Sequence, residues 1–207
     1  MSQWRGQIEN IDEPADVVEF VGDYYHVPTV LLVLGFMLWS RVENWKNFLV
    51  NGNVYFTGND PWYHYRMVAY TVRHWPQTSP FDPWTYFPYG THSSQFGTIM
   101  DQFTATVALV VGLGSPSEHT IKLVALFVPA VVGVLVALPV YAMAKRVSNR
   151  FGGVVAVLVL ALSASSFLGR STVGSFDHHV AEALMQTLAV FATMIAVSVA
   201  EGEKPVW

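Results

Sequence analysis

The chain has 207 residues, of which 52% are hydrophobic and only 13% are charged, and its mean hydropathy is +0.36. This composition is too apolar for a soluble domain of the same size, and it predicts an all-α, polytopic membrane protein. The formal net charge of −4 gives no support for nucleic-acid binding, and the absence of cysteine excludes disulfides and thiolate metal sites.

The N-terminal part of the chain divides into a polar segment and an apolar one. Residues 1–27 are polar and acidic, without the apolar core of a cleavable signal peptide, and we expect them to form a cytoplasmic segment. Pro28 then opens an apolar run. Residues 28–46 are therefore predicted to form the first membrane helix, which would also target the chain to the membrane.

Residues 47–119 are mostly polar, aromatic and proline-rich, and we expect them to form a large external loop. Within this loop, Asp60 follows an asparagine and precedes Pro61, which is the pattern of a helix start. Apolar and aromatic residues then recur at helical spacing until Pro76. Asp60 is therefore either a plain helix-start residue or a functional carboxylate.

Four apolar segments lie between residues 98 and 200. They are residues 98–113, 120–144, 151–167 and 181–200. The last three are predicted to be membrane helices two, three and four. Residues 145–150 form the most basic short loop, which the positive-inside tendency places in the cytoplasm, together with residues 201–207.

The first of these segments decides on which side of the membrane the polar loops lie. Asp60 and Asp177 share a side only if an even number of spans separates them, and three apolar segments lie between them. Residues 98–113 are the best candidate for a segment that does not cross, because at about 1.5 Å per residue they are shorter than a bilayer is thick. We expect this helix to lie at the outer surface, with Asp101 as a helix-start residue there.

The external loop 168–180 contains the sequence Gly-Ser-Phe-Asp-His-His-Val, which ends at Val180. A carboxylate and two histidines between two membrane helices are costly unless they are used. Asp177 and His179 are two residues apart, so in an extended segment their side chains point the same way and supply half of a divalent-metal site. The alternative is that Asp177 only caps the helix that follows. The residues alone leave both interpretations open.

Three motifs, taken together and in this order, resemble the catalytic subunit of oligosaccharyltransferase. They are Gly58-Asn59-Asp60-Pro61-Trp62-Tyr63-His64, Tyr86-Phe87-Pro88-Tyr89-Gly90 and Arg170-Ser171-Thr172-Val173-Gly174-Ser175-Phe176-Asp177-His178-His179. The Asp-His-His form is most similar to the archaeal AglB type. The resemblance covers essentially the whole chain. It implies a GT-C-like helix bundle with a large external first loop, in the cell membrane, with the active site facing outside.

The resemblance also assigns site residues. A divalent cation, Mn²⁺ or Mg²⁺, would be held by Asp60, Asp177 and His179. Asp60 would be the catalytic carboxylate and would lie beside the acceptor asparagine, while His178 and His92 would contact the phosphate of the lipid donor. The implied reaction moves a glycan from a dolichyl-phosphate-type lipid-linked oligosaccharide to the asparagine of an Asn-x-Ser/Thr sequon, with inversion.

The chain departs from the family pattern in two ways. The Trp-Trp-Asp-Tyr-Gly motif of the family's external domain does not occur, and the sequence ends at Trp207, soon after the last apolar run. We interpret the chain as an N-terminal portion and expect no transferase activity from it alone. Two alternatives remain: another lipid-phosphate-sugar-dependent membrane glycosyltransferase, or a transporter fragment, which would carry ionisable groups near mid-membrane.

Overall fold

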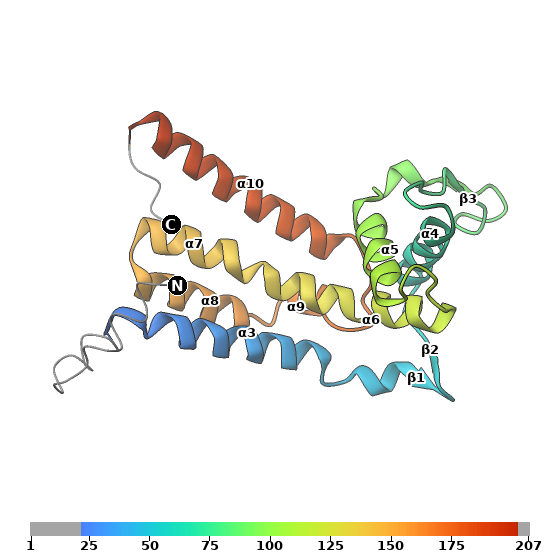
Figure 1. Ribbon diagram of the computed structural model, residues 1–207, viewed down its shortest axis with the longest axis horizontal. Helices are drawn as coiled ribbons and strands as arrows, with labels where there is room; N and C mark the ends of the chain where they lie inside the picture. Colours follow the sequence, from blue (N-terminus) through green and yellow to red (C-terminus); the bar gives the residue numbers. More distant parts are fainter. Residues whose placement is uncertain (1–21, 203–207) are drawn as a thin grey trace.

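A computed structural model describes residues 22–202, and this part of the chain is mostly helical. Most of the helices form an elongated body, and two others form a lobe across one end of it (Figure 1). The body consists of α3 (His26–Val42), α6 (Glu118–Leu135), α7 (Ala137–Val147), α8 (Arg150–Leu162), α9 (Ser166–Arg170) and α10 (His179–Ala200). The lobe contains α4 (Asp60–His74) and α5 (Ile99–Val111).

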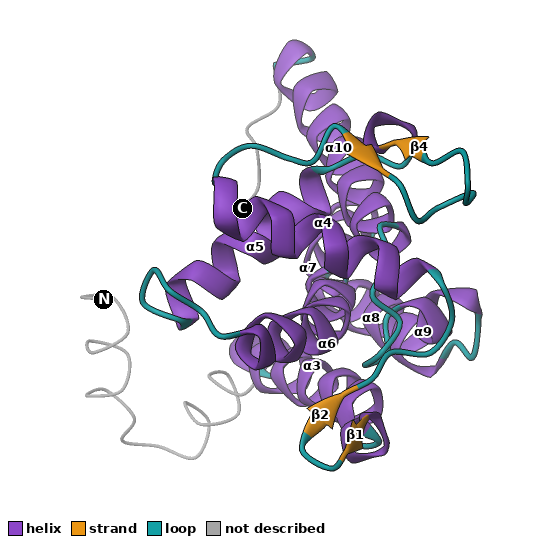
Figure 2. Ribbon diagram, turned by 90° about the vertical axis from the view of Figure 1, so that its right-hand side faces the viewer, coloured by secondary structure: helices purple, strands orange, loops and turns teal. Residues whose placement is uncertain are grey.

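Two small antiparallel hairpins lie at opposite edges of the lobe when the molecule is viewed from that end (Figure 2). One pairs β1 (Leu49–Val50) with β2 (Asn53–Val54), after the 3₁₀ helix η1 (Trp45–Phe48). The other pairs β3 (Phe81–Asp82) with β4 (Thr91–His92), before the 3₁₀ helix η2 (Ser93–Gln95). The first hairpin packs against α6 through Val54, and the second is tied to α4 by the ion pair between Arg66 and Asp82.

The predicted apolar segments correspond to helices, with shifted ends. The segment predicted at 120–144 extends over Glu118–Val147 as α6 and α7, and within residues 22–202 this stretch and α10 are the two that are long and apolar enough to cross a membrane. The helix predicted at 151–167 ends at Leu162, because the serines that follow leave the helical pattern, and Ser163 turns its hydroxyl back to the Val159 carbonyl. The predicted segment 1–27 lies mostly outside the described residues, as does the end of 201–207.

Helix α6 is the central element of the packing. One apolar cluster joins it to α4, α5 and the segment before α10, and includes Val68, Leu126 and Phe176. A second cluster joins α3, α7 and α8 around Met37 and Val157. Helix α10 differs, because only 6% of its most apolar stretch is buried, and it slants away from the other long helices of the body (Figure 1).

The segment that leads to Asp177 is fixed by a buried arginine. Arg41 of α3 is 1% exposed; its Nε donates to the Ser171 hydroxyl at 2.9 Å, and its carbonyl accepts from the Val173 amide. Gly133 of α6 leaves room for this contact, since a Cβ there would lie 2.5 Å from the Ser171 side chain. Gly174 then turns the chain at φ +83°, where a Cβ would collide with the Phe48 ring. Asp177 therefore follows a firmly placed turn.

Candidate metal centre

The centre is built from α4, α5 and the residues just before α10. Pro61 near the start of α4 fits the first helical turn, and the helix buries the face that carries His64. His64 is 2% exposed, and its Nδ1 lies 2.8 Å from Oδ1 of Asp101, a 1% exposed residue in the first turn of α5. An imidazole and a carboxylate are thus paired away from solvent, between two helices of the lobe.

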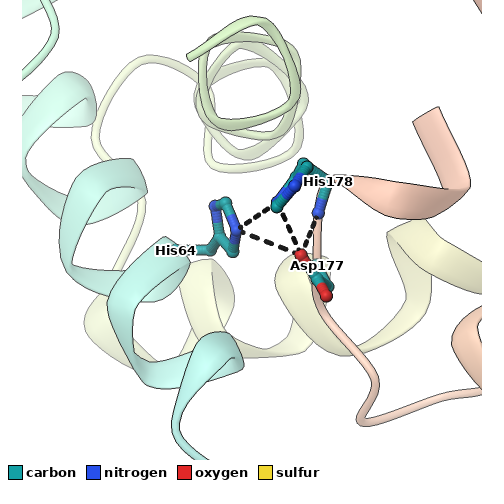
Figure 3. Close-up of side chains that lie close together, drawn as sticks. All are labelled: His64, Asp177 and His178. Carbon is teal, nitrogen blue, oxygen red and sulfur yellow. Dashed lines mark hydrogen bonds and ion pairs between the residues drawn. The ribbon is translucent and has the colours of Figure 1, made fainter. Parts of the chain in front are cut away.

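The two oxygens of Asp177 face different surroundings. Oδ1, the inner oxygen, lies 2.7 Å from His178 Nδ1 and 3.4 Å from His64 Nε2, and it accepts the His178 backbone amide at 2.6 Å (Figure 3). Oδ2, the outer oxygen, lies 3.3 Å from Arg170 Nη1 and 3.4 Å from His179 Nε2. The inner oxygen is therefore enclosed, whereas the neighbours of the outer oxygen are partly exposed side chains.

His64, Asp101, Asp177, His178 and His179 form one cluster of ionisable side chains. Their contacts shift the pKa values of three members, His64, Asp177 and Asp101. Burial alone would lower the pKa of His64, but the hydrogen bonds and charges of Asp101 and Asp177 outweigh it and raise that pKa to about 9. Burial would raise the pKa of Asp177, but His64, His178 and His179 lower it to about 2. Burial raises the pKa of Asp101, although the His64 hydrogen bond opposes that rise. Asp177 is therefore an anion at neutral pH and available as a ligand.

Two groups of side chains among the described residues bring three ligand atoms close enough to hold one metal ion. One is His64, Asp177 and His178, and the other is His178, His179 and Glu182. Imidazole nitrogens and carboxylate oxygens suit first-row divalent ions. The structure thus places a possible metal site at the junction of α4 with the segment before α10, where the sequence indicated half of one.

The predicted site residues are only partly brought together. Asp177, His178 and His179 all belong to the cluster. Asp60 is exposed at the first position of α4 and belongs to neither group of the described residues, but it lies one helical turn before His64, about 6 Å along the helix, on the same face. His92 is exposed on β4, with its ring edge-on to Phe81. The set of Asp60, Asp177 and His179 therefore stays a prediction.

Asp60 also lines a cavity of roughly 530 Å³. The first turns of α4 form one wall, and aromatic residues of the loop between β3 and α5, among them Trp84 and Phe96, form the other. Arg66 lines this cavity too, but its guanidinium is held by Asp82 through contacts of 2.6 and 3.1 Å. Asp60 is thus an accessible carboxylate beside a partly aromatic pocket.

Two members of the cluster were not assigned from the sequence. Asp101 does lie in the first turn of its helix, as expected, but its carboxylate is buried against His64 because α5 packs on α4. His64 stands four residues after Asp60 and therefore shares its helix face. For His64, this spacing from Asp60 was the signal in the sequence. For Asp101, the signal was a single acid in an otherwise apolar segment.

A family model described as the N-terminal part of oligosaccharyl transferase STT3 matches residues 30–206. The dolichyl-monophosphooligosaccharide–protein glycotransferase AglB of Haloferax volcanii is 48% identical over 191 residues, which are 92% of this chain and 18% of the relative. Dolichyl-phosphooligosaccharide–protein glycotransferase 3 of Archaeoglobus fulgidus is 32% identical over 173 residues, 84% of this chain and 20% of the relative. The chain spans about a fifth of the length of these relatives.

Solved structures with the same fold come from Archaeoglobus fulgidus. Its oligosaccharyltransferase in the apo form has a TM-score of 0.73 and 32% identity, over 81% of this chain and 19% of that one. The archaeal AglB bound to an inhibitory peptide and a dolichol-phosphate also has a TM-score of 0.73 and 32% identity, over 83% and 19%. A complex with Zn and sulfate has a TM-score of 0.71 and 32% identity, over 79% and 20%.

Proposed function

Because the chain belongs to the oligosaccharyl transferase STT3 family, we propose that it is the N-terminal part of a membrane oligosaccharyltransferase. The reaction would transfer a glycan from a dolichyl-phosphate-type lipid donor to the asparagine of an Asn-x-Ser/Thr sequon. The names of the relatives support the reaction class. The Archaeoglobus structures with a dolichol-phosphate and with a peptide containing the NVT sequon support the donor and acceptor classes.

One contact carries this proposal: His64 meets Asp177 and His178. It brings the helix that begins at Asp60 against the Asp-His-His segment, more than 110 residues later in the chain. The cluster lies at the lobe end of the body and not half-way along its helices (Figure 1). This position favours chemistry at a membrane surface over the transport path that the alternative function would need.

The donor set fits a divalent cation. We propose that Asp60, Asp177 and His179 hold Mn²⁺ or Mg²⁺; the imidazole favours Mn²⁺, since Mg²⁺ prefers oxygen ligands. The 3.4 Å approach of His179 Nε2 to the outer oxygen of Asp177 supports this assignment, as does the related structure that contains Zn. The cation would supply positive charge that offsets the negative charge of the leaving lipid phosphate.

The remaining roles fall to side chains around this set. Asp60 would accept a hydrogen bond from the amide of the acceptor asparagine and orient its nitrogen, because its carboxylate faces an open cavity. His178 and His92 would contact the donor phosphate; the His178 side chain is 24% exposed, and His92 is exposed. Inversion requires the amide nitrogen and the lipid phosphate to lie on opposite faces of the sugar carbon, so no side chain need form a covalent bond.

We further propose a multi-pass topology in which α3, the α6–α7 stretch, α8 and α10 cross the membrane and α5 does not. The lobe would face outside and residues 145–150 the cytoplasm. The His64–Asp177 contact supports an even number of spans between these residues. Single-cysteine labelling of intact cells at Asn59 and Ser175 tests this arrangement without background, because the chain has no cysteine. Labelling from opposite sides would rule out a shared external site.

A chimera tests the function itself. The matched N-terminal segment of the Haloferax volcanii relative would be replaced by this chain, and transfer to an Asn-x-Thr peptide from a dolichyl-phosphate-linked glycan would be measured by mass spectrometry. We expect transfer by the chimera, a loss of about 100-fold or more with Asp60→Asn or Asp177→Asn, and no transfer by the 207-residue chain alone. Undiminished transfer with Asp177→Asn would refute the proposed site.

A further inference from the structure

We propose that His64 and Asp101 are positioning residues of the cation site, which hold the inner oxygen of Asp177 so that its outer oxygen faces the cation beside His179. This inference rests on the proposed function, because it takes Asp177 as a cation ligand. It adds two residues, from α4 and α5, that the resemblance did not assign.

The first support is an ordered chain of contacts through the buried interior. Asp101 Oδ1 lies 2.8 Å from His64 Nδ1, and His64 Nε2 lies 3.4 Å from the inner oxygen of Asp177. The His64 ring is also confined by the Phe176 ring, edge-on at 5.8 Å, and by the Tyr63 ring at 5.0 Å. An imidazole held at one nitrogen by a carboxylate presents its other nitrogen in a fixed direction, which is how ligand shells around metals are commonly oriented.

The second support is the asymmetry of Asp177. Its inner oxygen receives the His178 backbone amide and faces both His178 Nδ1 and His64 Nε2. Within residues 22–202, its outer oxygen faces the side chains of His179 and Arg170, which are 39% and 52% exposed. Fixing one oxygen stops the carboxylate from rotating, so less conformational freedom is lost when the other oxygen binds a cation. His64 supplies the tie from the far side of the junction.

The third support is the state of Asp101. Its Oδ2 is buried and has no hydrogen-bond partner among residues 22–202. A buried carboxylate with an unpaired oxygen is costly for a residue that serves stability alone. Asp82, equally buried at 1% exposure, has partners at both oxygens. We expect this difference between the two oxygens of Asp101 if Oδ1, the paired one, serves to orient His64.

The test measures cation affinity and not turnover. The chain would be placed in lipid nanodiscs, and Mn²⁺ binding would be followed by the loss of the free-ion signal in electron paramagnetic resonance. We expect Asp101→Asn and His64→Gln each to weaken Mn²⁺ binding by about 10- to 100-fold. Two matched controls should bind as the unaltered chain does: Asp82→Asn, at another buried aspartate, and His74→Gln, at an exposed histidine of the same helix.

Thermal unfolding of all four variants separates affinity from folding. If Asp82→Asn lowers Tm as much as Asp101→Asn does but leaves Mn²⁺ affinity unchanged, the effect at Asp101 is specific to the site. With ¹⁵N-labelled histidine, the number of nitrogen couplings at saturating Mn²⁺ should be the same in His64→Gln as in the unaltered chain. The loss of one coupling would make His64 a direct ligand and overturn the positioning role.

Asp177→Asn distinguishes the two levels of the proposal. If this variant loses Mn²⁺ binding while His64→Gln and Asp101→Asn bind normally, the positioning inference fails and the cation site stands. If Asp177→Asn also binds normally, the proposed cation site fails and the inference falls with it. Weakened binding in all three variants, with normal binding in both controls, supports the proposal.

Discussion

Two buried aspartates, Asp82 of β3 and Asp101 of α5, contact different faces of α4 and are hydrogen-bonded in very different ways. Asp82 accepts Arg66 at both oxygens, and Thr85 and the Trp84 amide complete its hydrogen bonds. Asp101 has His64 as its hydrogen-bond partner among the described residues, and one of its oxygens is unpaired. His64 and Arg66 are two residues apart, roughly 200° around the helix. One helix thus separates two ion pairs. In the closed pair, Asp82 with Arg66, both carboxylate oxygens have partners. In the open pair, Asp101 with His64, one carboxylate oxygen has no partner among the described residues.

The difference shows in the ionisation of the two acids. Burial would raise the pKa of Asp82, but Arg66, Thr85 and the Trp84 amide outweigh it, so that pKa is lowered. At Asp101 burial prevails and the pKa is raised. A closed pair stabilises the loop that it joins and has no capacity left for a ligand. The open pair passes its constraint to Asp177, so we assign structure to the first and function to the second.

The largest effect should come from breaking the closed pair. Asp82→Leu leaves the Arg66 guanidinium, whose side chain is only 32% exposed, without its carboxylate, and it removes the acceptor of the Thr85 hydroxyl and amide. We expect the free energy of unfolding to fall by about 3–5 kcal/mol. Chemical denaturation in detergent would measure this fall. The double variant with Arg66→Met should recover part of the loss; no recovery would mean that the pair is not the cause.

Whether a feature could be predicted from the sequence depends on how far apart in the chain the interacting residues are. Hydropathy located the helical segments, because membrane-length apolar runs need no tertiary information. The start of α6 at Glu118 is likewise local, since the Ser117 hydroxyl accepts the Thr120 amide. The pairing of His64 with Asp101 joins residues 37 apart and exists only because α5 packs on α4. Periodicity shows which face of a helix is buried, but not which residue meets it.

A smaller effect, visible only in the metal-free protein, should follow pH at the open pair. The pKa of His64 is about 9 in the folded chain and 6.5 ordinarily, so its stabilisation is complete below about pH 6.5 and disappears as pH rises through 9. The pKa of Asp177 is about 2 against 3.8, so its contribution is present above 3.8 and disappears as pH falls through 2.

Unfolding in the presence of a chelator should therefore show a fall on the order of 3 kcal/mol or less between pH 6.5 and 9. His64→Gln should remove most of this slope, whereas Asp82→Asn should retain it, because the pKa of Asp82 is lowered and its carboxylate is ionised throughout that range. Equal slopes in the unaltered chain and in His64→Gln would show that the pH dependence arises elsewhere.

The smallest effect concerns the outer oxygen of Asp177. The Arg170 guanidinium lies 3.3 Å from it, but its side chain is 52% exposed, so the ion pair is weak and screened by salt. A cation that binds the outer oxygen must displace or approach this positive charge. Arg170→Gln should therefore strengthen Mn²⁺ binding slightly, by no more than about fivefold, and the gain should vanish at high salt.

Arg150→Gln is the matched control. Arg150 is the first residue of α8, its side chain is 46% exposed, and it forms an ion pair with Asp23. The start of α8 lies at the opposite end of the body from the lobe (Figure 1). Arg150→Gln should leave Mn²⁺ affinity unchanged. Weaker binding in Arg170→Gln would show that Arg170 holds Asp177 in place and does not compete with the cation. Both oxygens of Asp177 would then be held by protein groups, and Asp177 would resemble the closed pair at Asp82 more than a ligand held ready by an open one.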